Sequence, residues 1–553
     1  MPVARGIRFE INILDFDIAC GGQSRTIILH TVNMTREFRP PELYNAAAEL
    51  IDRNLRSGRG GKIAFIDDRA SCTYAELADR VHRCANALRN EGLEPEQRVV
   101  LCLLDTIDFP TCFLGAIEAG IVPIPLNTLL TAEDYAFILA DARPKAAIVS
   151  EARSAAFHEA ARLAGWGGRV IVAASELESR LENASAAAQV ARTRPDEACF
   201  WLYSSGSTGD PKGVVHRHTS LARTAELFGH GVLGLSETDV VYSAAKLFFA
   251  YGLGNALTFP MWAGATSMLF ASRPTPEAVN AILRERRPTI FCGVPTLFNS
   301  LLGSGALPRA GEHAMRLCTS AGEALPEQVG RAWREHTGVD IVDGIGSTEM
   351  LHIFVSNRPG SVCYGVTGRP VPGYRVRLVD EHGADVAPGE IGEMHVSGPT
   401  SAACYWNNAE KTRETFLGEW VRTGDKFRQT EDGDFVYCGR RDEMLKVGGI
   451  WVSPMEVEAA IMAHASVFEA AVVGAEDENG LVKPMAFVVL KPGAHGGMGL
   501  SEALQDFVKT RIAPYKYPRW IEFVDALPKT ATGKIQRFLL KKRANELHAA
   551  AGH

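Results

Sequence analysis

The sequence predicts an α/β fold that is divided into more than one domain. Its 553 residues exceed what one ordinary hydrophobic core holds, so two or more domains are expected. Up to residue 295, apolar runs of strand length alternate with segments of helical periodicity. This alternation is typical of parallel sheets covered by helices. After about residue 365 the pattern becomes short and turn-rich, and after residue 451 it becomes a small α+β unit.

Four apolar runs are the predicted strands of the parallel sheets. They are RVVLCLLD (98–105), KAAIVS (145–150), RVIVAAS (169–175) and TIFCGVP (289–295). A helix is predicted over TYAELADRVHRCANALRN (73–90), because Thr73 is a favourable N-cap before apolar residues at helical spacing.

The later part of the chain is expected to form hairpins and then a separate small domain. YRVRLVDEHGADVAPGEIGEMHVSG has Gly and Asp turn residues at hairpin spacing. SPMEVEAAIMAH, EAAVVGAEDENGLVKPMAFVVL and SEALQDFVKTRI read as the helices and strands of an α+β unit. We place the domain boundary within GRRDEMLKVGG (439–449).

Composition excludes several classes of protein. Hydrophobic residues make up 46% and charged residues 22%, which is typical of a soluble globular protein, and the net charge of −7 argues against a nucleic-acid-binding surface. No run of eighteen apolar residues predicts a membrane span. The eleven cysteines form no CxxC pair, so a reducing cytoplasm is expected and no zinc site is predicted.

The first 33 residues do not fit the pattern of the rest of the chain. Acidic residues at Glu10, Asp15 and Asp17 occupy positions where a signal peptide needs an apolar core. We expect residues 1–33 to be a poorly ordered extension and the folded part to begin near Met34. A strand-like arm that docks onto the fold is the alternative.

YSSGSTGDPKG (203–213) has the composition of a phosphate-binding loop. It lacks the G-x-x-x-x-G-K-[ST] spacing of a Walker loop, since Asp210 and Pro211 separate Gly209 from Lys212. Hydroxyls and glycine backbone can still donate hydrogen bonds to phosphate while Lys212 supplies charge. The flanking segments predict a strand before the loop and a helix after the lysine. A flexible connector has the same composition.

This loop is similar to the signature loop of the adenylate-forming superfamily, which includes the acyl- and aryl-CoA synthetases. DGIGSTEM (343–350), RTGD (422–425), GRRDEMLKVGG (439–449) and PKTATGKIQR (528–537) resemble further motifs of the family, in the same order. The resemblance covers about residues 40–545. It implies a large N-terminal domain (34–440) of two α/β subdomains and a β-barrel-like part, followed by a small mobile α+β domain (441–553).

The resemblance also implies the nucleotide site. Glu349 and Thr208 would hold Mg²⁺, since hard cations prefer oxygen ligands. Without the family context, Glu349 reads as a helix N-terminal charge, Asp425 as a turn residue and Arg440 as a surface ion pair. The implied ATP contacts are Ser204, Ser205, Gly206, Ser207, Thr208, Gly209, Lys212, Gly322, Glu323, Ala324, Asp343, Gly344, Ile345, Gly346, Ser347, Thr348, Asp425 and Arg440.

Two lysines are implied to act in different steps. Lys534 would bridge the attacking carboxylate and the α-phosphate, which otherwise repel each other. The small domain would then turn about a hinge at Asp442 and bring Lys446, Gly448 and Gly449 to the acyl-adenylate.

KLFFAYGLGNALTFPMWAGA (246–265) and STEMLHIF (347–354) resemble the benzoate–CoA ligase version of the family. Aromatic clusters of this kind are more often plain core, and His352 also reads as a satisfied core histidine. The residues implied to line a flat aryl slot are Phe249, Ala250, Tyr251, Gly252, Leu351, His352 and Ile353.

The resemblance therefore implies an ATP-dependent ligase that joins benzoate to CoA, with Mg²⁺ as cofactor. Alternatives are a ligase for 2-aminobenzoate or a hydroxybenzoate, an adenylation enzyme that loads a carrier protein, and an inactive binding protein. The implied partners are an aromatic carboxylate and CoA, with no nucleic acid and no membrane. The sequence does not decide between a monomer and a homodimer.

Overall fold

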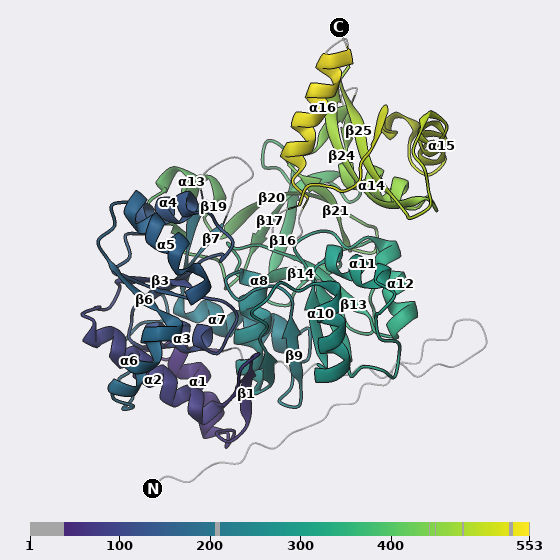
Figure 1. Cartoon of the computed structure of the whole chain (residues 1–553). Helices are drawn as coiled ribbons and strands as arrows, with labels where there is room; N and C mark the ends of the chain where they lie inside the picture. Colours follow the sequence, from purple (N-terminus) through teal and green to yellow (C-terminus); the bar gives the residue numbers. More distant parts are fainter. Residues whose placement is uncertain are drawn as a thin grey trace, which may run out of the picture. The chain divides into compact units, whose positions relative to one another are not determined.

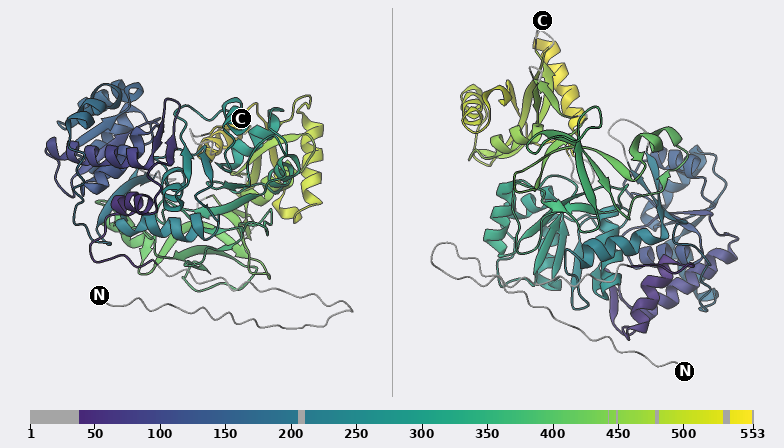
Figure 2. Two further views of the ribbon diagram at one scale, coloured as in Figure 1. Left: turned by 90° about the horizontal axis from the view of Figure 1, so that it is seen from below. Right: turned by 180° about the vertical axis from the view of Figure 1, so that it is seen from behind.

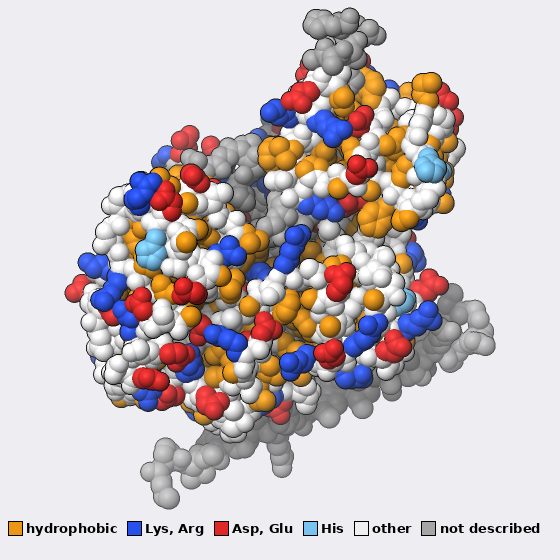
Figure 3. Space-filling view, in the orientation of Figure 1, with side chains coloured by type: hydrophobic (Ala, Val, Ile, Leu, Met, Phe, Trp, Pro, Cys, Tyr) orange, Lys and Arg blue, Asp and Glu red, His pale blue; other side chains and the backbone are white. Residues whose placement is uncertain are grey.

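The computed structural model in Figure 1 describes residues 38–204, 211–441, 443–447, 450–477, 481–529 and 535–551. All elements below belong to the unit Pro40–His553. No helix in these ranges is both long and apolar enough to cross a bilayer. On the face in Figure 3, Lys and Arg side chains are interspersed with Asp and Glu.

A four-stranded parallel sheet with the order β4-β3-β5-β6 forms the first α/β subdomain. Every residue of β4 and β5 is buried, as expected for parallel strands covered on both faces. Three of the predicted strands are confirmed here, and β3 ends at Cys102, so that Asp105 lies in the following loop. The elements are β3 (Arg98–Cys102), β4 (Val122–Pro125), β5 (Ala146–Val149), β6 (Arg169–Val172), α3 (Asp108–Glu118), α4 (Ala132–Ala142), α5 (Glu151–Leu163), η1 (Ala173–Leu177) and α6 (Glu178–Asn183).

A nine-stranded sheet with the order β15-β14-β13-β12-β11-β9-β10-β1-β2 forms the second α/β subdomain. Its centre is parallel from β13 to β1, and the fourth predicted strand is confirmed as β11. Buried Trp333 packs edge-on against Phe298, with 4.7 Å between ring centroids. The strands are β1 (Ile63–Ile66), β2 (Ser71–Thr73), β9 (Val240–Ser243), β10 (Thr266–Met268), β11 (Ile290–Gly293), β12 (Leu317–Ser320), β13 (Ile341–Gly346), β14 (Ile353–Ser356) and β15 (Arg369–Pro370).

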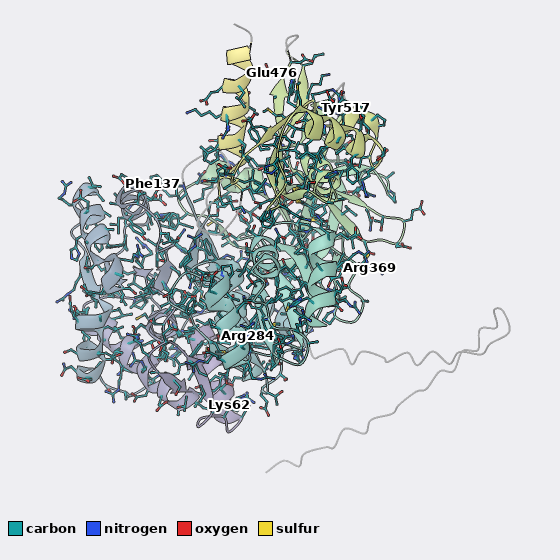
Figure 4. The ribbon with its side chains drawn as sticks, turned by 45° about the vertical axis from the view of Figure 1, so that its right-hand side comes forward. Lys62, Phe137, Arg284, Arg369, Glu476 and Tyr517 are labelled. Atoms are coloured by element: carbon teal, nitrogen blue, oxygen red, sulfur yellow. The ribbon has the colours of Figure 1, made fainter. Side chains whose placement is uncertain are left out.

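Helices from both α/β subdomains flank these sheets (Figures 1 and 2). The predicted helix after Thr73 is confirmed as α2, and Thr73 and Glu76 form a capping box. In Figure 4, Phe137 of α4 marks the first subdomain and Arg284 of η4 marks the second. The helices are α1 (Ala46–Arg56), α2 (Tyr74–Asn90), α7 (His218–Thr224), η2 (Ala225–His230), α8 (Ala250–Leu253), η3 (Gly254–Thr258), α9 (Phe259–Ala263), α10 (Pro276–Ala281), η4 (Ile282–Arg286), α11 (Pro295–Gly303) and α12 (Glu327–Thr337).

Antiparallel strands come next in the sequence. The predicted hairpin is confirmed, since β16 pairs with β17 from Arg375 opposite Ser397 to Val379 opposite Glu393. A five-stranded sheet contains β16, β17, β20, β19 and β21, and a three-stranded sheet has the order β18-β8-β7. The bounds are β7 (Ala198–Ser204), β8 (Lys212–Arg217), β16 (Arg375–Val379), β17 (Ile391–Ser397), β18 (Cys404–Tyr405), α13 (Ala409–Thr415), β19 (Phe416–Leu417), β20 (Trp420–Gln429) and β21 (Phe435–Arg440).

The C-terminal part is a small α+β domain, as predicted. Its sheet has the order β24-β25-β26, and the two longest strands are antiparallel. The elements are β22 (Leu445–Val447), β23 (Ile450–Val452), α14 (Pro454–Met462), β24 (Val467–Glu476), β25 (Val482–Leu490), α15 (Met498–Lys509), η5 (Pro514–Lys516), β26 (Trp520–Phe523) and α16 (Arg537–Ala551).

Candidate active site

The two ends of the predicted phosphate loop are paired strands. Ser204 ends β7 and lies opposite Lys212, which begins the antiparallel strand β8. A helix follows the lysine as predicted, but strand β8 lies between them, because helix α7 begins at His218. Val214 and Val215 are buried between β7 and β18, which explains why this segment is a strand. The loop residues Ser205, Gly206, Ser207, Thr208 and Gly209 lie outside the described residues.

Two tryptophans lie beside this strand pair. The rings of Trp201 in β7 and Trp406, which follows β18, are 4.5 Å apart between centroids. The Trp406 indole N–H donates to the carbonyl of Asp141 over 3.0 Å. Gly213 allows this packing, because a Cβ there would lie only 3.3 Å from Cβ of Trp406.

Strand β8 also fixes the backbone around Glu349. Nε2 of His216 donates to the carbonyl oxygen of Thr348 over 2.8 Å. Burial lowers the pKa of His216 to about 3, so this ring is neutral and carries its proton on Nε2. The amide of Ala402 donates to the carbonyl oxygen of Glu349 over 2.8 Å. Glu349 lies in a turn, so its reading as a helix N-terminal charge is wrong.

The side chain of Glu349 meets a tyrosine and the loop lysine. The hydroxyl of Tyr405 donates to Oε1 of Glu349 over 2.7 Å. Nζ of Lys212 lies 5.8 Å from the centroid of the Tyr405 ring. Burial, and then the neighbouring charge of Lys411, lower the pKa of Lys212, while Glu349 raises it. A cation and a hydrogen-bonded carboxylate therefore converge at the end of the phosphate loop.

Tyr405 was not predicted as a site residue. It is a β-strand residue in the segment AACYWNN, which carries no motif. Its place beside Glu349 results from the pairing of β18 with β8, residues that lie far apart in the sequence.

Asp425 and Arg440 lie opposite each other on β20 and β21. Nη1 of Arg440 is 3.1 Å from Oδ1 of Asp425 and donates to the carbonyl of Thr423 over 3.2 Å. The Asp425 side chain is 9% exposed and that of Arg440 is 41% exposed. Arg440 also lowers the pKa of Lys212, so the ion pair lies near the end of the phosphate loop. The structure therefore brings these predicted residues together.

The predicted adenine segment lies against Asp343. Gly322, Glu323 and Ala324 follow β12, and Gly322 has a φ of +97°, which favours glycine. Burial raises the pKa of Asp343 to about 8. A buried, protonated carboxyl group therefore lies beside the predicted adenine segment.

The predicted aryl-slot residues also converge. His352 is buried, its Nε2 lies 3.3 Å from the carbonyl oxygen of Tyr251, and the two rings are 5.4 Å apart between centroids. The rings of Phe228 and Phe259 lie 5.2 and 4.6 Å from His352. We call these four rings the aromatic wall of the slot. Burial lowers the pKa of His352 to about 3, so the aromatic wall carries no charge at neutral pH.

Glycines let backbone and rings approach in this region. A Cβ on Gly254 would lie 2.4 Å from Cδ2 of His352, and one on Gly252 would lie 2.0 Å from the carbonyl oxygen of Lys246. Leu351 has a φ of +67°, an uncommon value for a residue other than glycine. It precedes His352 and Ile353 at the start of β14.

Several predicted residues remain untested by the geometry. Lys446 belongs to β22, but its side chain is outside the described part. Asp442, Gly448, Gly449 and Lys534 are outside the described residues, as is the extension 1–33.

The described residues fit a cation that is held largely by its nucleotide. No group of three His, Cys, Asp or Glu residues converges within the described ranges. Glu349 offers one carboxylate, so nucleotide phosphates and water would supply the other oxygen ligands, an arrangement that suits Mg²⁺.

Comparison with known proteins gives two family matches. The model of the AMP-binding enzyme family matches residues 52–406, and that of the AMP-binding enzyme C-terminal domain matches residues 456–534. The chain is 58% identical to the benzoate–CoA ligase of Thauera aromatica, over 91% of this chain and 96% of that protein. It is 50% identical to the 4-hydroxybenzoate–CoA/benzoate–CoA ligase of Rhodopseudomonas palustris, over 90% and 94%.

Solved structures agree with these matches. A benzoate CoA ligase from Burkholderia xenovorans is 52% identical and superposes with a TM-score of 0.86, covering 90% of this chain and 100% of that one. An anthranilate CoA ligase in complex with anthranoyl-AMP is 40% identical with a TM-score of 0.88, covering 92% and 99%. Because the family match, the identities and the superpositions extend over both parts of the fold, this chain belongs to the AMP-binding, adenylate-forming enzyme family.

Proposed function

We propose that this protein is an ATP-dependent benzoate–CoA ligase, which converts benzoate, ATP and CoA to benzoyl-CoA, AMP and diphosphate. The observation that carries the proposal is the 58% identity to a benzoate–CoA ligase over 91% of the chain. The converging side chains at the end of the phosphate loop and the uncharged aromatic wall support it.

In the first step, a carboxylate oxygen of benzoate attacks the α-phosphorus of ATP and the bond to the bridging oxygen breaks. Benzoyl-adenylate forms and diphosphate leaves. Lys212 and the phosphate loop hold the phosphates, and Asp425 accepts hydrogen bonds from the ribose hydroxyls while Arg440 holds its carboxylate. Lys534 offsets the repulsion between the carboxylate and the α-phosphate. Glu349 and Thr208 would hold Mg²⁺, which when bound would supply positive charge to offset that of the diphosphate.

Benzoate enters as a flat, apolar ring. Ala250 and Tyr251 come from α8, Ile353 begins β14, and Leu351 and His352 directly precede that strand. The neutral His352 offers edge and face contacts to a ring without attracting the substrate carboxylate elsewhere. The carboxylate is therefore left to point at the nucleotide.

In the second step, the sulfur of CoA attacks the acyl carbon and AMP leaves. The small domain (441–553) turns about Asp442 between the two steps, which withdraws Lys534 and brings Lys446, Gly448 and Gly449 to the adenylate. The N-terminal domain (34–440) keeps the nucleotide and the ring in place, so one site serves both reactions.

A substituted benzoate is the second candidate for the acid. The relative that is 50% identical is named for 4-hydroxybenzoate as well as benzoate, and the 40% identical structure holds anthranoyl-AMP. These two acids keep the ring and the carboxylate of benzoate and differ from it only by one polar substituent.

The test is diphosphate release with a panel of acids, each with and without CoA. We expect benzoate to give the highest kcat/KM and benzoyl-CoA to accumulate only when CoA is present. A higher kcat/KM for 2-aminobenzoate or 4-hydroxybenzoate would favour the second candidate. Diphosphate release that depends on a carrier protein instead of CoA would contradict both candidate functions.

A further inference from the structure

The two α/β subdomains are joined by a buried carboxylate. Asp105 follows β3 of the four-stranded sheet, and Leu247 follows β9 of the nine-stranded sheet. Both carboxylate oxygens of Asp105 lie 3.3 Å from the amide nitrogen of Leu247, which donates to them. Asp105 is only 3% exposed. This contact therefore links the end of one parallel sheet to the backbone of the other subdomain.

Leu247 belongs to the segment 246–252, which leads into the aryl slot. The amide of Phe249 donates to the carbonyl oxygen of Lys246 over 3.0 Å. That carbonyl also packs against Gly252, where a Cβ would approach it to 2.0 Å. A shift of Lys246 and Leu247 must therefore move α8, which carries Ala250 and Tyr251.

The charge of Asp105 has a favourable partner in the same segment. Burial raises the pKa of Asp105 to about 6, while the Lys246 ammonium and the Leu247 amide lower it. The group is thus mostly ionised at neutral pH. Nζ of Lys246 is held by the carbonyl of Ser272 at 2.8 Å and by that of Phe270. A buried charge is costly to keep, so a side chain that only filled space would be apolar.

We propose that Asp105 is a positioning residue for the acid substrate. Its carboxylate, fixed in the first subdomain, holds the backbone of residues 246–252 in the second subdomain at the position that the ring requires. The acid is benzoate only if the proposed function holds, but the positioning role applies to whichever carboxylic acid the slot accepts.

Asp67 supplies a matched control on the same subdomain junction. It follows β1, and its Oδ2 accepts from the amide of Ile107 over 3.0 Å. Its Oδ1 accepts from the amides of Arg69 and Ala70, each over 2.8 Å. Asp67 is 6% exposed, and these three hydrogen bonds join it to residues outside the 246–252 segment.

The first test separates acid binding from ATP binding. Removing a hydrogen bond to a charged group and leaving the Leu247 amide unpaired should raise KM for the acid about 10-fold or more in Asp105→Ala. KM for ATP should change less than about twofold, because no nucleotide contact is altered. Asp105→Asn keeps an oxygen acceptor and should restore KM for the acid to within about threefold. Asp67→Asn should leave the ratio of the two KM values unchanged, even where it lowers the melting temperature.

The second test does not depend on turnover. Amide hydrogen exchange in a peptide that covers residues 244–253 should accelerate in Asp105→Ala and stay at the wild-type rate in Asp67→Asn. If Asp105→Ala does not fold, Asp105→Leu fills a similar volume without an acceptor and takes its place.

These outcomes separate the two proposals. If the wild type prefers an acid other than benzoate, the KM ratio is measured with that acid, and only the proposed function fails. If no acid is turned over, hydrogen exchange decides alone. An unchanged exchange rate at residues 244–253 in Asp105→Ala, or an equal rise of KM for the acid in Asp67→Asn, would overturn the positioning role.

Discussion

The hydroxyl of Tyr405 donates a 2.7 Å hydrogen bond to Oε1 of Glu349. Tyr405 is held in register with Val214 by the pairing of β18 and β8, while the backbone of Glu349 is held by Ala402. The carboxylate that we assign to the metal is therefore oriented by the strand that begins with Lys212.

Tyr405→Phe should weaken the use of Mg-ATP. The loss of a hydrogen bond to a carboxylate should lower kcat/KM for ATP about 10-fold, and raised Mg²⁺ should recover part of the loss. KM for the acid should stay within about twofold. Steady-state diphosphate release at several Mg²⁺ concentrations measures this. Tyr374→Phe is the control, since that hydroxyl contacts Thr400 over 2.8 Å and not Glu349. Equal effects of both substitutions would contradict the assignment.

Ala250→Leu should narrow the aryl slot. Overpacking a tight site typically costs ~1–3 kcal/mol, or about 10- to 150-fold in kcat/KM, so benzoate and ring-substituted benzoates should both lose at least about 10-fold. KM for ATP should hold. The wild type should prefer benzoate to acetate and to octanoate, because a flexible chain loses rotamer entropy in a short slot. A preference for octanoate, or a leucine variant that handles benzoate normally, would show that this segment is not the aryl slot.

Lys534→Ala should separate the two half-reactions. Diphosphate formation should fall on the order of 10²–10³-fold, because the ammonium acts where carboxylate meets phosphate. Thioester formation from supplied benzoyl-adenylate and CoA should survive. Lys446→Ala is the complementary control, and it should impair mainly the second step, thioester formation. Rapid-quench assays of each half-reaction distinguish these outcomes, and equal losses in both steps for Lys534→Ala would rule out the domain turn.

Buried histidines should make the fold sensitive to acid. Burial lowers the pKa of His218 from 6.5 to about 4, so the folded state binds fewer protons than the unfolded state below pH 6.5. Its contribution is complete above pH 6.5 and is lost as the pH falls toward 4, at about 1.4 kcal/mol per pH unit. Urea unfolding at pH 7.5 and 5.0 should show that the free energy of unfolding falls less between these pH values in His218→Gln than in the wild type. The exposed His158 is the control, and His158→Gln should behave as the wild type does.

Removing residues 1–33 should change neither activity nor melting temperature appreciably. The prediction rests on the sequence, because these residues lie outside the part of the chain that resembles the family. Thermal unfolding and kcat/KM of the shortened and full-length proteins compare the two. A melting temperature lowered by more than a few degrees would show that the extension is a docked arm.

Local patterns predicted the parallel strands and the capped helix well. Strands such as β5 are buried along their whole length, and Thr73 caps α2 through Glu76 as its spacing indicates. Strand β8, which lies between Lys212 and the predicted helix, was not predicted. Tertiary pairing with β7 and β18 decided the conformation there, and no local signal reveals such pairing.

For the site as well, local motifs predicted some residues and missed those whose position depends on tertiary pairing. Asp425 and Arg440 were predicted by their motifs, and the structure pairs them across two adjacent strands. Tyr405 and Asp105 carry no motif, and each acts on a residue far away in the chain. The contact of Asp105 with Leu247 spans 142 positions, and it exists only because two sheets end at the same junction.

The adjacent indoles of Trp201 and Trp406, whose planes are inclined by 32°, give the enzyme an intrinsic optical signal. Two indoles with ring centroids 4.5 Å apart couple their electronic transitions, which adds an exciton contribution to the circular dichroism that separate tryptophans lack. Trp406 packs on Gly213, the residue directly after Lys212, so nucleotide that shifts this strand also changes the coupling. Circular dichroism can therefore test for such a shift without a label and before any bond is made.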